Sequence, residues 1–176
     1  MCEYCGCQEI ATIGELTAEH DAVVSEISLL RAHFAAGRMS EVSASCRRMA
    51  TILGPHTMVE EEGLFPELAA EYPDHIAALR AEHRDVETVL AQAQPGAPTD
   101  PTWPERLLAT LAVLRDHILK EQDGVFPAAL ASLDGEQWER VEAVRARVSA
   151  ACSGTAGNVR GDPAGFDPDL AQHSGR

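Results

Sequence analysis

Apolar residues recur along this chain at helical spacing, three or four positions apart, and few segments show the strict alternation of a β-strand. The apolar stripes predict four long helices, over residues 14–36, over 40–63, from Pro73 onward and over 105–123. Asp134 and Gln137 resemble a capping box and predict a fifth, shorter helix that ends near Ala151. The proline-rich segment 94–104 predicts a rigid loop between the third and fourth helices.

Prolines mark further local features of the second and fourth helices. Pro55 lies inside the second helix and predicts a kink there. Both helices end in a Gly-x-Phe-Pro sequence, which predicts that each helix stops at that point. We expect the two Phe-Pro corners to cap one end of the molecule, with Phe65 and Phe126 serving in packing rather than in chemistry.

Four amphipathic helices with mostly short connections pack best as a bundle. We therefore predict an all-α fold, an up-down-up-down four-helix bundle with a short fifth C-terminal helix and a flexible tail. The bundle is expected over residues 12–152, after a cysteine-rich N-terminal segment over 1–11. Residues 153–176 are rich in Gly, Pro and Asp and form the predicted tail.

Composition narrows the class of protein and its partners. The chain has 176 residues, of which 45% are hydrophobic and 24% charged, as expected for one soluble domain. The net charge of −14 repels phosphate backbones, so we expect no nucleic-acid partner. No apolar run approaches the length of a membrane span, and the N-terminus does not resemble a secretory signal. We therefore expect no membrane partner and a cytoplasmic location.

The chain contains an internal repeat. Ala18-Glu19-His20 recurs as Ala81-Glu82-His83, and the segment His56–Pro66 recurs as His117–Pro127. Each half thus has one helix with a single His, followed at a similar distance by a helix with His-x-x-x-Glu. Residues four apart lie on one helix face, so the His and Glu of each such pair point the same way.

Six residues of this repeat continue the apolar stripes and are predicted to converge in the interior: His20, His56, Glu60, His83, His117 and Glu121. Buried carboxylates without a partner cost many kcal/mol or take up protons, and a metal would compensate for them. Four imidazoles and two carboxylates are too many for one tetrahedral zinc. They suit two adjacent six-coordinate ions bridged by the carboxylates, with iron as the first candidate and manganese as the second.

Each motif taken alone has a simpler interpretation. A single His-x-x-x-Glu is more often an ion pair on a helix surface, and a lone His in an apolar stripe is more often a hydrogen-bonded core residue. Two copies of the pair, each with an upstream His at a similar distance, favour the metal interpretation.

At these residues the chain resembles the hemerythrin family, specifically the hemerythrin-like HHE cation-binding domains, over about residues 12–130. The resemblance implies a four-helix up-down bundle with a non-heme di-iron site, and it implies the same six residues as ligands. The carboxylate-bridged di-iron enzymes related to ferritin use Glu-x-x-His instead. No His of this chain has a Glu three residues before it, so that family is excluded.

The chain departs from the oxygen-carrying members of the family at two places. The carriers have a second His on the third helix, four residues from the first, where this chain has Leu79 and Glu87 around His83. Their last carboxylate is typically an Asp five residues after its His, whereas Glu121 follows by four. Glu87 and Glu61 are candidates for an additional ligand. Fewer His ligands disfavour reversible oxygenation and favour oxidation or reaction with peroxide.

Three thiols, Cys2, Cys5 and Cys7, lie within six residues at the N-terminus. Such a group can bind a metal, form a reversible disulfide or sense oxidants, and the alternative is a flexible end without function.

The first functional hypothesis is a di-iron module that binds O2, peroxide or NO and passes the signal to a redox partner through these thiols. The alternatives are a di-iron enzyme that reduces peroxide, and iron storage or buffering.

Overall fold

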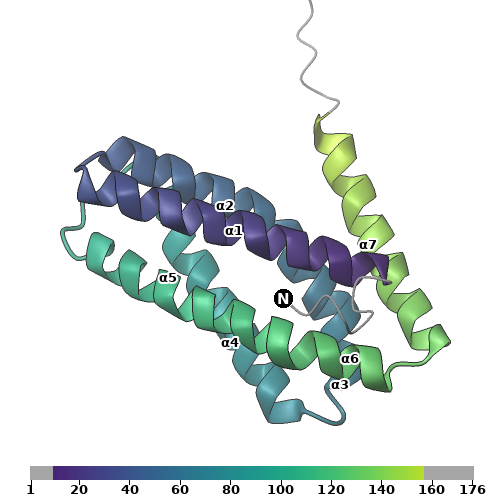
Figure 1. Cartoon of the computed structure of the whole chain (residues 1–176). Coiled ribbons are helices and arrows are strands. Elements are labelled where there is room, and N and C mark those ends of the chain that lie inside the picture. The colour runs from purple at the N-terminus through teal and green to yellow at the C-terminus, as the bar shows by residue number, and fades with distance from the viewer. Residues whose placement is uncertain (1–9, 157–176) are drawn as a thin grey trace, which may run out of the picture.

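The computed structural model describes residues 10–156, and these residues form helices joined by mostly short connections, without a strand in that range. These helices make up four long rods. The rods lie side by side in Figure 1, with a further helix outside them. The first rod is α1 (Ala11–Ala35) and the third is α4 (Pro73–Ala91), which begins at the predicted proline. The all-α fold predicted from the sequence is confirmed.

The second and fourth rods are longer than predicted because neither stops at its Gly-x-Phe-Pro sequence. The second rod consists of α2 (Met39–Val59), a π-helical turn η1 (Glu60–Leu64) and α3 (Phe65–Leu68). The fourth consists of α5 (Trp103–Lys120), η2 (Glu121–Val125) and α6 (Phe126–Ser132). The predicted stops are therefore wrong, while α2 also runs through Pro55 without interruption.

Hydrogen bonding explains how the second rod passes its Phe-Pro sequence. In the wider π turn the backbone N–H of Phe65 donates to the carbonyl of Glu60, five residues back. Pro66 has no N–H, so the carbonyl of Glu61 has no donor from the helix ahead of it. The side chain of Arg80 on α4 supplies one, with its Nη2 2.9 Å from that oxygen. A tertiary contact thus stabilises the rod where the local sequence predicts an end.

The rods pack as a four-membered ring, in which α1 contacts α2 and α5, and α4 contacts α2 and α5. The interior contains two apolar clusters. One includes Val23, Leu53, Val86 and Leu114, and the other includes Leu16, Val59, Leu79 and Val125. On the first three rods the two clusters are separated by a short stretch that carries His20, His56 or His83, and on the fourth rod the stretch between Ile118 and Val125 carries Glu121. A polar layer therefore crosses the bundle between two apolar cores.

The fifth helix, α7 (Gly135–Ala156), lies outside the bundle beside the end where α1 begins (Figure 1). It has 22 residues, more than the 18 of α5, so the expectation of a short helix is wrong. Its predicted capping box is confirmed. The backbone N–H of Asp134 donates to Gln137 Oε1 over 3.0 Å, and that of Gln137 donates to Asp134 Oδ1 over 2.9 Å.

The outer parts of the chain are only partly described. Helix α7 extends into the range predicted as a tail, and the remainder of that tail lies outside the described residues, as does most of the N-terminal segment 1–11. None of the helices in residues 10–156 combines the length and the apolar composition needed to cross a membrane.

Candidate metal centre

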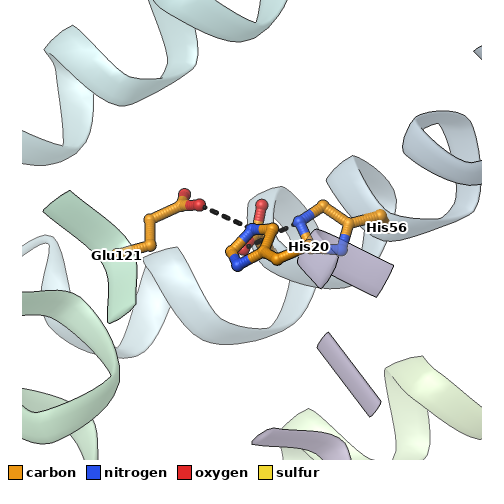
Figure 2. Close-up of side chains that lie close together, drawn as sticks. His20, His56 and Glu121 are labelled. Atoms are coloured by element: carbon orange, nitrogen blue, oxygen red, sulfur yellow. Dashed lines mark ion pairs between the residues drawn. The ribbon is translucent and has the colours of Figure 1, made fainter. Parts of the chain in front are cut away.

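All six residues predicted to converge lie in the polar layer, and none is more than 6% exposed. They come from every rod of the bundle: His20 from α1, His56 and Glu60 from α2 and η1, His83 from α4, and His117 and Glu121 from α5 and η2. Figure 2 shows the rings of His20 and His56 and the carboxylate of Glu121 gathered at one point in the interior.

The potential ligand atoms form two groups of four that share both carboxylates. One group is His20, His56, Glu60 and Glu121, and its ligand atoms lie within 4.8 Å of one another. The other group meets the same limit with His83 and His117 in place of the first two histidines. Each group therefore offers two imidazole nitrogens and two carboxylate oxygens.

Each carboxylate faces both halves of the repeat. Oε1 of Glu60 lies 3.3 Å from Nε2 of His56 on its own rod, and Oε2 lies 3.4 Å from Nε2 of His83. Oε1 of Glu121 lies 3.0 Å from Nε2 of His117, and Oε2 lies 3.2 Å from Nε2 of His20. Glu60 and Glu121 are thus placed as two carboxylates that bridge a pair of cations would be.

Three of the histidines are held from outside by a second set of carboxylates. Nδ1 of His56 lies 2.9 Å from Oε2 of Glu19. Nδ1 of His117 lies 2.9 Å from Oε2 of Glu82. Nδ1 of His83 lies 3.0 Å from Oε1 of Glu61. A neutral imidazole that donates from Nδ1 keeps its lone pair on Nε2, so these contacts direct three lone pairs toward the centre.

Sequence reasoning missed Glu19 and Glu82, although both stand in the Ala-Glu-His repeat. Each holds the histidine of the following His-x-x-x-Glu helix rather than its own neighbour. Each is itself paired with a cation: Arg145 of α7 places Nη2 2.7 Å from Oε1 of Glu19, and Lys120 pairs with Glu82. The signal in the sequence was the acidic residue directly before the single His in both halves.

The aromatic residues of the Phe-Pro sequences also contact the centre. The ring of Phe126 stacks on His20 with centroids 5.6 Å apart, and Phe65 stacks on His83 at 5.7 Å. The two phenylalanines have the predicted packing role, and each packs against the single His of the other half. Each π turn brings its glutamate, Glu60 or Glu121, and the phenylalanine that follows the turn to this layer.

Electrostatics in the interior favour positive charge beside the two carboxylates. Burial opposes the charged form of His56, but Glu60 and Glu19 outweigh it and raise the pKa of His56 to about 10. Burial likewise opposes ionised Glu60, yet His56 and His83 hold the pKa of Glu60 well below its ordinary value. The pKa of His117 is raised against the effect of burial by Glu121 and Glu82. The centre therefore attracts cations, whether protons or metal ions.

Unpaired polar atoms show that the residues present fit two metal ions. Both oxygens of Glu60, both oxygens of Glu121 and both nitrogens of His20 are buried without a hydrogen-bond partner among the described residues. Nε2 of His83 and Nε2 of His117 lie only 2.9 Å apart, although both rings already contact a carboxylate through Nδ1. Buried polar groups are ordinarily satisfied, and cations among these atoms would satisfy the carboxylate oxygens and the Nε2 atoms, while Nδ1 of His20 would still have no partner among the described residues.

A small cavity adjoins the four imidazoles. It has a volume of about 10 Å³, close to the size of one water molecule, and its remaining lining is largely apolar: Leu53, Thr57, Val86, Glu87, Leu114 and Ile118. The side chain of Glu87 is exposed and lies outside both groups of ligand atoms. Glu61 contacts the outer nitrogen of His83 rather than the centre. The structure thus places neither candidate for an additional ligand in the cluster.

The candidate thiols Cys2, Cys5 and Cys7 lie outside the described residues. Cys46 is buried in the apolar core, and burial raises the pKa of its thiol to about 12. This thiol is therefore a packing group rather than a reactive one.

Comparison with known families agrees with this geometry. The hemerythrin HHE cation binding domain matches residues 11–129, a range that contains all six clustered residues and ends before α7. No curated protein and no solved structure gives a significant match to the chain. Because the matched range covers most of the chain and contains both groups of buried His and Glu ligand atoms, the chain belongs to the hemerythrin HHE cation-binding domain family and contains a metal-binding domain.

Proposed function

We propose that this chain is a non-heme di-iron protein that binds O2 or a related small oxidant, peroxide or NO, and acts in oxygen or redox sensing or response. The observation that carries the proposal is the pair of buried four-donor groups that share Glu60 and Glu121. Two cations at these groups would each have two imidazoles and two bridging oxygens.

The donor set supports iron over zinc. A structural or catalytic zinc uses three or four protein ligands in tetrahedral geometry, which would leave part of this buried cluster without a cation. Imidazole and carboxylate ligands together suit iron, and manganese is the weaker candidate. Four protein donors per ion leave coordination positions that a small oxidant can occupy.

The surrounding residues prepare this site for a small reactant. Iron, when bound, supplies the electrons that an oxidant takes up. The chain holds three of the four imidazoles in one tautomer through Glu19, Glu61 and Glu82, and its apolar cavity walls exclude bulk water. The size of the cavity favours a reactant of two or three atoms over an organic substrate.

Peroxide reduction is the second candidate function. Leu79 is buried in an apolar cluster and Glu87 is exposed, so α4 supplies one imidazole where oxygen carriers have two. A centre with fewer imidazoles favours oxidation of the iron over reversible oxygenation. In either function the thiols of Cys2, Cys5 and Cys7 are the proposed contact with a redox partner.

Metal analysis and rapid mixing test the proposal. The purified full chain is expected to contain two irons, and His83→Ala is expected to lose at least one of them. His75→Ala changes an exposed histidine of the same helix and is expected to keep both. One zinc per chain without iron would contradict the proposal. Stopped-flow absorbance with peroxide then separates the functions, since a stable adduct indicates binding and sustained turnover indicates an enzyme.

A further inference from the structure

The two halves of the centre differ at the position of the repeat that follows the shared glutamate. The residue after the bridging glutamate is Glu61 in the first half and Gln122 in the second. Glu61 contacts Nδ1 of His83, with 3.0 Å between Oε1 and the ring nitrogen. His20 occupies the corresponding place in the other half, and its Nδ1 is buried without a hydrogen-bond partner in the described part of the chain.

This difference is confined to the outer contacts of the imidazoles. Both single histidines stack on a phenylalanine in nearly the same way, with interplanar angles of 9° for His20 and 8° for His83. Both ligand groups share Glu60 and Glu121, so the carboxylates do not distinguish them. His56 and His117 each have an outer carboxylate, at 2.9 Å in both cases. Within residues 10–156, His20 is the repeat histidine without an outer carboxylate.

An outer carboxylate orients an imidazole and makes it a stronger donor to a metal ion. The group with His83 and His117 has two imidazoles supported in this way, whereas the group with His20 and His56 has one. The metal position beside His83 and His117 should therefore bind its ion more tightly. The ion beside His20 should exchange more easily, because one of its two imidazoles has no carboxylate to hold it.

We propose that the two metal positions are inequivalent, with a tight position at His83 and His117 and a weaker, exchangeable position at His20 and His56. Glu61 is the positioning residue that sets this difference, and Gln122 is its neutral counterpart. The inference rests on the proposed function only in that the centre binds two ions.

Reciprocal exchange of the two residues tests the inference. The metal-free full chain is titrated with Mn²⁺, and free Mn²⁺ is counted by electron paramagnetic resonance. Two binding steps are expected for the native chain, but repulsion between the ions also separates steps, so the variants decide. Glu61→Gln should weaken the tighter step by about 10- to 100-fold and bring the two steps together. Gln122→Glu should increase the affinity of the weaker step and so also reduce the difference in affinity between the two steps.

The double exchange Glu61→Gln with Gln122→Glu is the matched control, because it conserves net charge and should restore two separated steps. If Glu61 merely supports the fold, the double variant should not restore two separated binding steps. The inference is overturned if both single variants leave the gap unchanged, or if Glu61→Gln weakens both steps equally. Should Glu61→Gln lose its helical circular dichroism, Gln122→Glu alone decides. Binding of fewer than two ions by the native chain would instead contradict the proposed function itself.

Discussion

Each supported imidazole in this centre has two distinct neighbours, a carboxylate outside and the shared carboxylates inside. For His117 the outer neighbour is Glu82, which is paired in turn with Lys120. The outer contact determines which nitrogen carries the proton, and the inner nitrogen is then free to bind a metal. Residues one layer away from the cluster therefore control its chemistry.

Replacing Glu82 tests this relation at the residue scale. Glu82→Gln keeps the size of the side chain but removes the carboxylate that holds His117, so iron affinity should fall by about 10- to 100-fold. Competition with a chelator measures the change. Asp85→Asn, an exposed substitution on the same helix, is the control and should bind iron as the native chain does. Equal affinity in both variants would show that Glu82 is a surface ion pair only.

The titration of His56 makes a second prediction, for the metal-free protein. Its pKa is raised to about 10, so the stability from charged His56 beside Glu60 is fully present below the ordinary value of 6.5. That stability is lost as the pH rises through about 10. The depressed pKa of Glu60 acts in the opposite direction, because its contribution is lost as the pH falls below its ordinary value of 4.5.

Thermal unfolding of the metal-free chain between pH 7 and 10.5 measures the alkaline loss. The melting temperature should decrease toward pH 10, and His56→Ala should show a smaller decrease over the same range. A metal-free chain whose stability is independent of pH across this interval would contradict the assignment.

At the scale of elements, the two π turns place the chemistry. Each begins at one of the two glutamates shared by the ligand groups and ends before a phenylalanine that stacks on a histidine of the other half. Their surroundings differ, since α7 packs over η1. A Cβ added at Gly63 would lie 3.3 Å from Cβ of Val144, whereas one at Gly124 would meet nothing within 4 Å.

Alanine at these two glycines gives a matched pair of variants. Gly124→Ala should stabilise the protein by up to about 1 kcal/mol, because alanine favours a helix. Gly63→Ala must displace Val144, which offsets that gain and costs about 1 kcal/mol or more. Urea unfolding should therefore rank Gly124→Ala above the native chain and Gly63→Ala below it. The reverse order would mean that α7 does not pack firmly on η1.

The sequence predicted these elements unevenly, for physical reasons. The apolar stripes located every rod because burial repeats with the helical period. The Gly-x-Phe-Pro sequence indicated a stop because proline disrupts an α-helix locally. The rod continues through tertiary contacts, including that of Arg80 with the carbonyl of Glu61, and such contacts between distant residues are not visible in a local pattern.

At the scale of the whole molecule, a polar layer divides two apolar cores, and it draws donors from all four rods. The six clustered residues were predictable because they repeat and continue apolar stripes. The outer glutamates were not, because Glu19 and Glu82 lie beside one histidine in sequence and contact another in space. The asymmetry at His20 likewise depends on side-chain geometry that spacing alone does not contain.

Metal removal tests the role of this layer in stability. An ion that binds only the folded chain stabilises it by about 2.7 kcal/mol at a hundredfold excess over its dissociation constant. For a chain of this size that corresponds to a rise of roughly 5–10 °C in melting temperature. Calorimetry of iron-loaded and metal-free protein should show this difference. Equal melting temperatures would indicate that the ions do not join the rods.

Anomalous scattering from crystals of the iron-loaded protein, measured at the iron edge, tests the central claim most directly. Two peaks are predicted between Glu60 and Glu121, one bound by His20 and His56 and the other by His83 and His117. A single peak, or peaks away from these side chains, would contradict the account.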